Sequence, residues 1–164
     1  MGTTIERLAA HEGERWREIR LRALQEAPDA FGTTFAQASA WPDDRWRKQV
    51  AEIATFAAVI DGNDVGVARG AGHPTRPDVR ELISMWVAPS ARRRGVGSRL
   101  VDAIAEWARA EGALTLVLDV REHNASALAL YASRGLGPFT GESLGAPAFG
   151  ETRMALSLAS TLHR

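Results

Sequence analysis

The stretch that decides the fold reads Ser84-Met85-Trp86-Val87-Ala88-Pro89-Ser90-Ala91-Arg92-Arg93-Arg94-Gly95-Val96-Gly97-Ser98. It predicts an apolar strand that stops at Pro89, a short basic turn with two glycines, and then a long amphipathic helix over roughly 97–111. This order points several backbone N–H groups at the space in front of the helix, where the helix dipole adds positive potential. Because the arginines add full charges, the stretch predicts an anion site that suits a pyrophosphate better than a carboxylate.

The composition is typical of one soluble globular domain, which we assign to residues 1–164 with a frayed tail over 159–164. Basic and acidic residues number 20 each, and the resulting zero net charge argues against nucleic acid as the main partner. The absence of cysteine excludes disulfides, thiolate catalysis and cysteine-ligated metals. Neither a signal peptide nor an apolar run of about 20 residues is present, which predicts a cytoplasmic protein that does not contact membranes. A single lysine among many arginines indicates a GC-rich genome, and we expect a bacterial source.

Hydrophobic periodicity predicts an α/β fold with a mixed, mostly antiparallel sheet of about seven strands and about four helices. Strands are predicted over 3–8, 55–60, 65–71, 79–87, 114–120, 139–142 and 151–158. Helices are predicted over 11–25, 41–53, 95–111 and 124–133, with a mixed loop over 29–40. Asp61-Gly62-Asn63-Asp64 is a hairpin turn signal between the second and third strands.

Two motifs follow one another in the second half of the chain. The first is Arg92-Arg93-Arg94-Gly95-Val96-Gly97, and the second consists of Asn124, Ala127, Leu130, Tyr131 and Gly135. They resemble the two signatures of the GCN5-related N-acetyltransferase (GNAT) superfamily, the first of which binds phosphate. Because both motifs occur in the family's order, separated by one helix and one buried strand, the chain is identified as a member of this superfamily. The predicted element order also fits the family fold over nearly the whole chain.

The resemblance implies acetyl-CoA as co-substrate, held between two splayed strands that end at Val87 and near Val120. The pantetheine arm is expected to pair with the backbone of the first of these strands, and the pyrophosphate to sit on the N–H groups of residues 94–98. The expected cofactor-binding residues are Met85, Trp86, Val87, Arg92, Arg93, Arg94, Gly95, Val96, Gly97, Ser98, Asn124, Ala127 and Tyr131. At least one of the arginines is expected to be a solvated side chain.

Direct acetyl transfer to an amine needs a base, an oxyanion donor and a proton for the leaving thiolate. Tyr131 falls on the family's motif tyrosine, so its phenol is a candidate general acid, although a packed aromatic side chain explains it as well. Glu81 is a candidate base by the resemblance, because many members of the family use a strand carboxylate at this place as the base, directly or through water. Period 2 places it on one strand face with apolar Ile83, Met85 and Val87, where a glutamate needs a reason such as a raised pKa or a partner. The alternative is a solvated carboxylate at a strand end. The oxyanion donor is expected to be a strand N–H, of Met85 or Val87.

The acceptor site is expected to involve Phe31 and Phe35, because the family uses the segment between the first two helices for its acceptor. Glu81, the candidate base on the strand 79–87, is expected to face the same acceptor. Core packing explains the two phenylalanines nearly as well. The four histidines are scattered without ligand spacing, so no metal site is predicted.

These patterns predict an acetyl-CoA-dependent N-acetyltransferase acting on a primary amine of a small molecule. Two alternatives stay open, a protein or peptide acetyltransferase acting on an N-terminus or lysine, and a non-catalytic acyl-CoA-binding member of the fold. A Rossmann-type site is disfavoured, because the glycine turn does not follow the first strand. Apolar residues over 151–158 would permit a homodimer.

Overall fold

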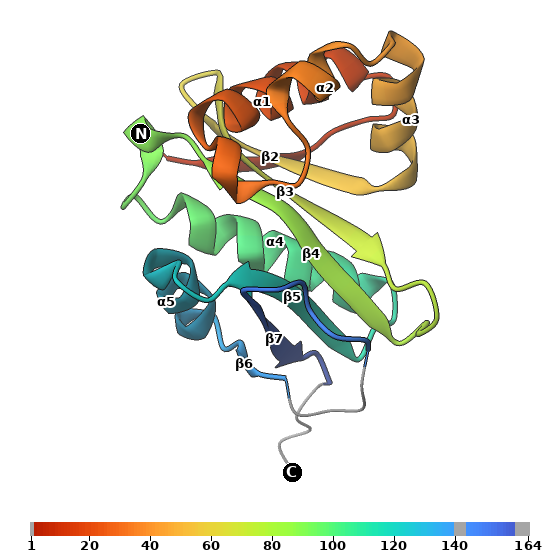
Figure 1. The fold of residues 1–164 in the computed structure, drawn as a ribbon, viewed down its shortest axis with the longest axis vertical. Coiled ribbons are helices and arrows are strands. Elements are labelled where there is room, and N and C mark those ends of the chain that lie inside the picture. The colour runs from red at the N-terminus through yellow and green to blue at the C-terminus, as the bar shows by residue number, and fades with distance from the viewer. Residues whose placement is uncertain (1, 140–143, 160–164) are drawn as a thin grey trace. The chain divides into compact units, whose positions relative to one another are not determined.

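The computed structural model describes residues 2–139 and 144–159 of the chain. Over these ranges it has five α-helices and seven strands, which follow the order β1-β2-β3-β4-β5-β7-β6 in one sheet (Figure 1). β4 and β5 are parallel, whereas the pairs β1–β2, β5–β7 and β6–β7 are antiparallel. The predicted α/β class with a mixed seven-stranded sheet is confirmed.

The bounds of the elements follow the predicted ones closely. The strands are β1 (Thr4–Arg7), β2 (Ala54–Ile60), β3 (Asn63–Gly72), β4 (Val79–Val87), β5 (Thr115–Arg121), β6 (Gly137–Pro138) and β7 (Glu151–Ser157). The helices are α1 (Gly13–Glu26), α2 (Phe35–Ser39), α3 (Asp43–Glu52), α4 (Val96–Ala110) and α5 (Ala125–Ser133), with 3-10 turns η1 (Pro28–Ala30) and η2 (Pro89–Ala91).

Three predictions about the elements need comment. The sixth strand was predicted over 139–142, but β6 covers Gly137–Pro138, and residues 140–142 lie outside the described residues. Of the expected frayed tail, all but Ala159 lies outside them as well. The prediction of about four helices missed α2, which occupies part of the predicted loop over 29–40.

The short helix α2 owes its start to a capping box. The Thr34 hydroxyl accepts from the Gln37 N–H at 3.1 Å, and the Gln37 side chain accepts in return from the Thr34 N–H at 3.0 Å. Thr-x-x-Gln is the sequence signature of this motif, but the five helical residues that follow are too few to show a periodic apolar face. The sequence therefore carried the signal for the helix start without a pattern that would extend it.

The chain divides into two compact units. The first comprises Met1–Arg69 and Ser84–Leu100, and the second comprises Gly70–Ile83 and Val101–Arg164. In the first unit α1, α2 and α3 gather beside β2 and β3, as Figure 1 shows in red and orange. Trp16 and Trp46 are almost fully buried there and meet edge to face, with ring centroids 6.3 Å apart. These two indoles form the centre of the first unit's core.

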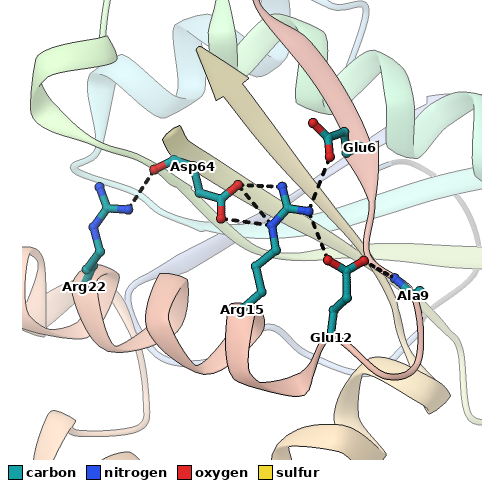
Figure 2. A network of polar contacts seen from close by, with 6 residues as sticks. All are labelled: Glu6, Ala9, Glu12, Arg15, Arg22 and Asp64. Carbon is teal, nitrogen blue, oxygen red and sulfur yellow. Dashed lines mark hydrogen bonds and ion pairs between the residues drawn. The ribbon is translucent and has the colours of Figure 1, made fainter. Parts of the chain in front are cut away.

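An arginine fixes the β2–β3 hairpin to α1 in the first unit. The Arg15 guanidinium donates to both carboxylate oxygens of Asp64, the shortest contact being 2.6 Å, and it also contacts Glu6 and Glu12 (Figure 2). Arg22, two turns further along α1, donates to the Asp64 carbonyl at 2.7 Å. Because Arg15 is surrounded by three carboxylates, its pKa is held well above the usual range, with the hydrogen bond to Asp64 as the main cause.

In the second unit β5 is the central strand, and its odd and even residues point to opposite faces. β4 pairs with it over three residues only, the last being Glu81 opposite Val117. Ser84, three residues further on, has a left-handed φ of 57°, which interrupts the regular pleat. The alternation predicted from Glu81 through to Val87 therefore does not continue past Ser84.

Close packing explains the two glycines inside β3. A Cβ at Gly66 would approach the Trp86 carbonyl oxygen to 3.0 Å, and one at Gly70 would lie only 2.4 Å from the Trp107 ring. Both distances are shorter than ordinary van der Waals contacts. The glycines thus leave room for an indole ring and for a neighbouring backbone.

We expect Gly70→Ala to destabilise the protein by about 1–3 kcal/mol, because the added methyl group would have to displace the rigid Trp107 ring. Gly72→Ala, in the same strand, is the matched control, since nothing lies within 4 Å of its Cβ position. Urea denaturation of both variants measures the difference. Equal stabilities for the two variants would contradict this account.

Candidate active site

The basic turn between β4 and α4 has the backbone shape of an anion cradle. Arg93 and Gly95 have positive φ angles of 64° and 77°, and Arg94 between them is not among the residues with positive φ. Alternating φ signs turn successive N–H groups toward one concave side, which is how backbone nests hold anions. The first helical hydrogen bond of α4 runs from the Arg99 N–H to the Gly95 carbonyl, so the N–H groups of residues 96–98 precede the helical ladder.

The side chain of Arg92 holds this turn to the end of β4 and to α1. Its Nε donates to the Val87 carbonyl at 3.0 Å, and its Nη2 donates to Glu26 at 2.9 Å. The same Glu26 oxygen accepts from the buried Trp86 indole at 2.9 Å. Arg92 therefore anchors the turn, although its side chain is exposed like those of Arg93 and Arg94. Val96 is buried at the helix start, and Gly97 and Ser98 are half-buried.

A cavity of about 570 Å³ lies in the first unit beside this turn. Its walls are the β2–β3 hairpin, one face of α1 and the residues that lead into α4. The hairpin side is the one that the Arg15–Asp64 ion pair fixes (Figure 2). The lining residues are Glu18, Ile19, Arg22, Ile60, Asp61, Gly62, Asn63, Asp64, Val65, Ser90, Ala91 and Arg94.

Glu81 stands in the second unit, where β4 meets β5. It is half-buried, and this burial raises the pKa of its carboxyl above the usual value. The negative charge of Asp119 raises the pKa further, whereas Arg153 and His73 oppose the change. Glu81 is therefore not a fully solvated carboxylate at a strand end.

Asp119 and Arg153 share one sheet face with Glu81. Glu81 is opposite Val117, Asp119 follows Val117 at period 2, and Arg153 is opposite Asp119 in β7. The Arg153 guanidinium binds the Asp119 carboxylate through two hydrogen bonds of 2.7 and 3.0 Å. It also donates to the Gly145 carbonyl at 2.6 Å, which brings residue 145 to this face.

Sequence reasoning missed Asp119 and Arg153. The available signal was one carboxylate inside an otherwise apolar strand and one arginine in an alternating strand. Only the register between β5 and β7 shows that the two charges meet.

The second motif forms helix α5. The Asn124 side chain accepts from the Ala127 N–H at 3.1 Å and so caps the helix. Asn124 itself is exposed and Ala127 is half-buried. Tyr131 lies two turns further on, is 6% exposed, and has a pKa that burial raises to about 12. Its phenol therefore keeps its proton at all ordinary pH values.

The two predicted acceptor-site phenylalanines lie in the first unit, whereas Glu81 lies in the second. Phe31 is half-buried beneath the Arg20 guanidinium, which sits 4.4 Å from the ring centroid. Phe35 is 40% exposed at the start of α2. Met85 and Val87 are half-buried in the last part of β4.

The sequence matches the acetyltransferase (GNAT) family over residues 14–137. The chain belongs to this family. It is also 30% identical over 128 residues to an aminoglycoside N(6′)-acetyltransferase type 1 from Klebsiella aerogenes, a match that covers 67% of this chain and 84% of that enzyme. A ribosomal protein bS18-alanine N-acetyltransferase from Salmonella typhimurium is 38% identical over 63 residues, covering 38% of this chain and 43% of that one. The predicted superfamily and acyltransferase class are confirmed.

Solved structures share the fold. A GNAT-family acetyltransferase from Streptococcus pneumoniae has a TM-score of 0.76 at 17% identity and covers 96% of this chain and all of its own. A putative acetyltransferase from Salmonella typhimurium, solved with its cofactor acetyl-CoA, has a TM-score of 0.73 at 19% identity and covers all of this chain and 98% of its own. At these identities the likeness concerns the fold.

Across 2–139 and 144–159, no group of three or more histidine, aspartate or glutamate side chains is arranged to hold a metal ion. In the same part of the chain, no helix is both long and apolar enough to cross a membrane.

We expect Asp119→Asn to lower the pKa of Glu81, because it removes the negative charge that disfavours ionisation. Arg153→Gln should raise it, because the opposing positive charge is lost. Arg134→Gln is the matched control, since Arg134 forms a similar two-bond pair with Asp102 on α4. NMR titration of the Glu81 carboxyl carbon measures the pKa of Glu81 in all three variants. The signal is assigned with Glu81→Gln. Shifts of the same sign in Asp119→Asn and Arg153→Gln would refute the charge assignment.

Proposed function

We propose that the protein transfers the acetyl group of acetyl-CoA directly to a primary amine of a small molecule. The observation that carries this proposal is the nest of N–H groups at Arg93–Gly95, placed at the start of α4 in a chain of the acetyltransferase family. The N–H groups of residues 94–98 would hold the pyrophosphate, with Arg93 and Arg94 as exposed counter-charges. Because Arg92 already binds Glu26 and Val87, it would contribute by fixing the turn.

Acetyl transfer needs a base, an oxyanion donor and a proton donor, and the remaining predicted site residues would fill these roles. Acetyl-CoA supplies an activated thioester, whose C–S bond breaks as the new C–N bond forms. Glu81 would take the proton from the attacking amine, a role that its raised pKa favours. A backbone N–H of Met85 or Val87 would stabilise the developing oxyanion, and the Tyr131 phenol would protonate the departing thiolate. Phe31 and Phe35 would belong to the acceptor side.

A small-molecule acceptor is favoured over a peptide by the coverage of the relatives. The match to the aminoglycoside acetyltransferase spans most of both chains, whereas that to the bS18-alanine acetyltransferase spans less than half of each. Parallel assays of thiol release from acetyl-CoA test which class of amine is the acceptor. The amines compared are an aminoglycoside, simple diamines, amino acids and an alanine-terminated peptide. Release with the peptide alone would favour the second candidate, and no release with any amine would favour a non-catalytic acyl-CoA-binding protein.

We expect Glu81→Gln to lower kcat by about 10²–10⁴, because the amine loses its proton acceptor. Tyr131→Phe should lower kcat with little change in the affinity for CoA, because it removes the proton donor but keeps the ring. Glu106→Gln, an exposed position on α4, should leave both constants unchanged. The kcat of the wild type should rise with pH through the Glu81 pKa, and this limb should vanish in Glu81→Gln. If the limb persists in that variant, Glu81 is not the base.

We expect Gly95→Ala to weaken CoA binding about 5–30-fold, because a left-handed residue with a side chain costs about 1–2 kcal/mol. No atom lies within 4 Å of the Cβ position, so the loss would come from the backbone and not from a clash. Gly95→Asn should lose less, since asparagine tolerates this conformation better. Calorimetry with CoA measures the three affinities. Unchanged binding in Gly95→Ala would contradict the nest.

A further inference from the structure

Two arginines in the first unit, the buried Arg69 and the half-buried Arg20, bind no carboxylate among the described residues, and the proposed chemistry does not use them. Arg69, in the middle of β3, is 5% exposed. Its Nε donates to the Thr55 hydroxyl at 3.1 Å and its Nη2 to the Gln49 carbonyl at 2.9 Å. The Trp16 ring lies 4.4 Å from its guanidinium carbon. All of these partners are neutral, so the charge of Arg69 is held by dipoles and an aromatic face.

Arg20 on α1 adds a second positive charge near the Trp16 ring. Its guanidinium stacks on Phe31 at 4.4 Å and lies 5.9 Å from the Trp16 ring. Its Nη1 is fully buried and has no hydrogen-bond acceptor. Burial lowers the pKa of both groups, and the neighbouring charge of Arg20 contributes to lowering that of Arg69 to about 10. Both guanidinium groups still carry their charge at neutral pH.

Arg20 and Arg69 differ in this respect from Arg15 and Arg153. The guanidinium groups of Arg15 and Arg153 bind carboxylates through several short hydrogen bonds. Within the part of the chain that the structure describes, neither Arg20 nor Arg69 makes such an ion pair. The indole N–H groups of Trp46 and Trp107 are buried without acceptors too, but they are neutral. An unpaired buried charge costs far more than an unpaired buried N–H.

We propose that Arg20 and Arg69 bind a carboxylate, and that this carboxylate belongs to the acceptor amine. The second half rests on the proposed function. A guanidinium presents its N–H groups in a planar fork that matches a carboxylate, and a second nearby cation strengthens the contact in a poorly solvated site. Arg20 as a whole is only half-buried, so its charge lies at the margin of the core. Phe31, beneath it, would contact the apolar part of the acceptor, which is thus an amino acid or a related amine with a carboxylate.

The carboxylate site is tested first without CoA, by thermal unfolding of the full chain in succinate and in neutral succinamide at equal ionic strength. Succinate is expected to raise the Tm, and succinamide is not. The shift should vanish in Arg20→Gln. It should persist in Arg45→Gln, the matched control, because Arg45 also stacks on an aromatic ring, at 3.8 Å from Trp41, but is exposed.

The stability of ligand-free Arg20→Gln separates binding from a structural role. If Arg20 is there to bind an anion, removing its charge relieves repulsion with Arg69, and the ligand-free Tm should equal or exceed that of the wild type. A lower Tm in Arg20→Gln, combined with no succinate shift in the wild type, would mean that Arg20 only packs on Phe31. A succinate shift that survives in Arg20→Gln would also overturn the proposal.

The identity of the carboxylate is tested by steady-state kinetics with an amino acid and its amide as acceptors. Arg20→Gln should raise the KM of the amino acid about ten- to a hundredfold, with kcat nearly unchanged, and leave the KM of the amide alone. If succinate binds but the KM of the amino acid does not change, the site takes a free anion, and the acceptor assignment is wrong. If no amine releases thiol, the proposed function fails, while the Tm measurements still decide whether the carboxylate site exists.

Discussion

The short parallel ladder between β4 and β5 is the constraint on which the rest of the structure depends. Two parallel strands need a long crossover, and α4 provides it. β4 ends at Val87 and α4 begins at Val96, and the basic turn lies in the connection between them. The ladder ends at Glu81 opposite Val117, and Ser84 then leaves the regular strand conformation. The carboxylate of Glu81 thus lies where the pairing of β4 with β5 stops, and the basic turn at Arg93–Gly95 follows later in the chain.

The distribution of charge is as informative as its sum. Equal numbers of acidic and basic residues give zero net charge, yet the arginines fall into distinct groups. Arg15 and Arg153 neutralise carboxylates and tie strands to neighbouring elements. Arg93 and Arg94 extend into solvent beside the cradle. Arg20 and Arg69 lie against aromatic rings; Arg69 donates to neutral acceptors only, and the buried Nη1 of Arg20 has no acceptor. The folded chain alone explains the charges of these two arginines least well.

Much of the fold was readable because the elements have clear periods and clear ends. β4 has the bounds that were predicted, and the start of α5 was marked by a capping asparagine. Helix α2 escaped because five residues cannot show a period, although its capping box was visible. The strand alternation through Glu81 and Val87 failed at Ser84, because nothing about a serine announces a left-handed φ. The candidate site was predicted in the same uneven way: Glu81 and Tyr131 were singled out, but Asp119 and Arg153 were not.

The sequence alone determined the family, the α/β class and the position of the anion turn, because these depend on residues that are close together in the chain. A glycine-containing turn before a helix presents free N–H groups at the helix start, and this local pattern can be read from consecutive residues. Tertiary structure decided the electrostatics. The pKa of Glu81 depends on burial and on Asp119 and Arg153, which reach it through strands far apart in sequence. Arg20 and Arg69 likewise come close to each other only when α1 packs on β3. Coulomb interactions depend on distance in space and not on separation along the chain.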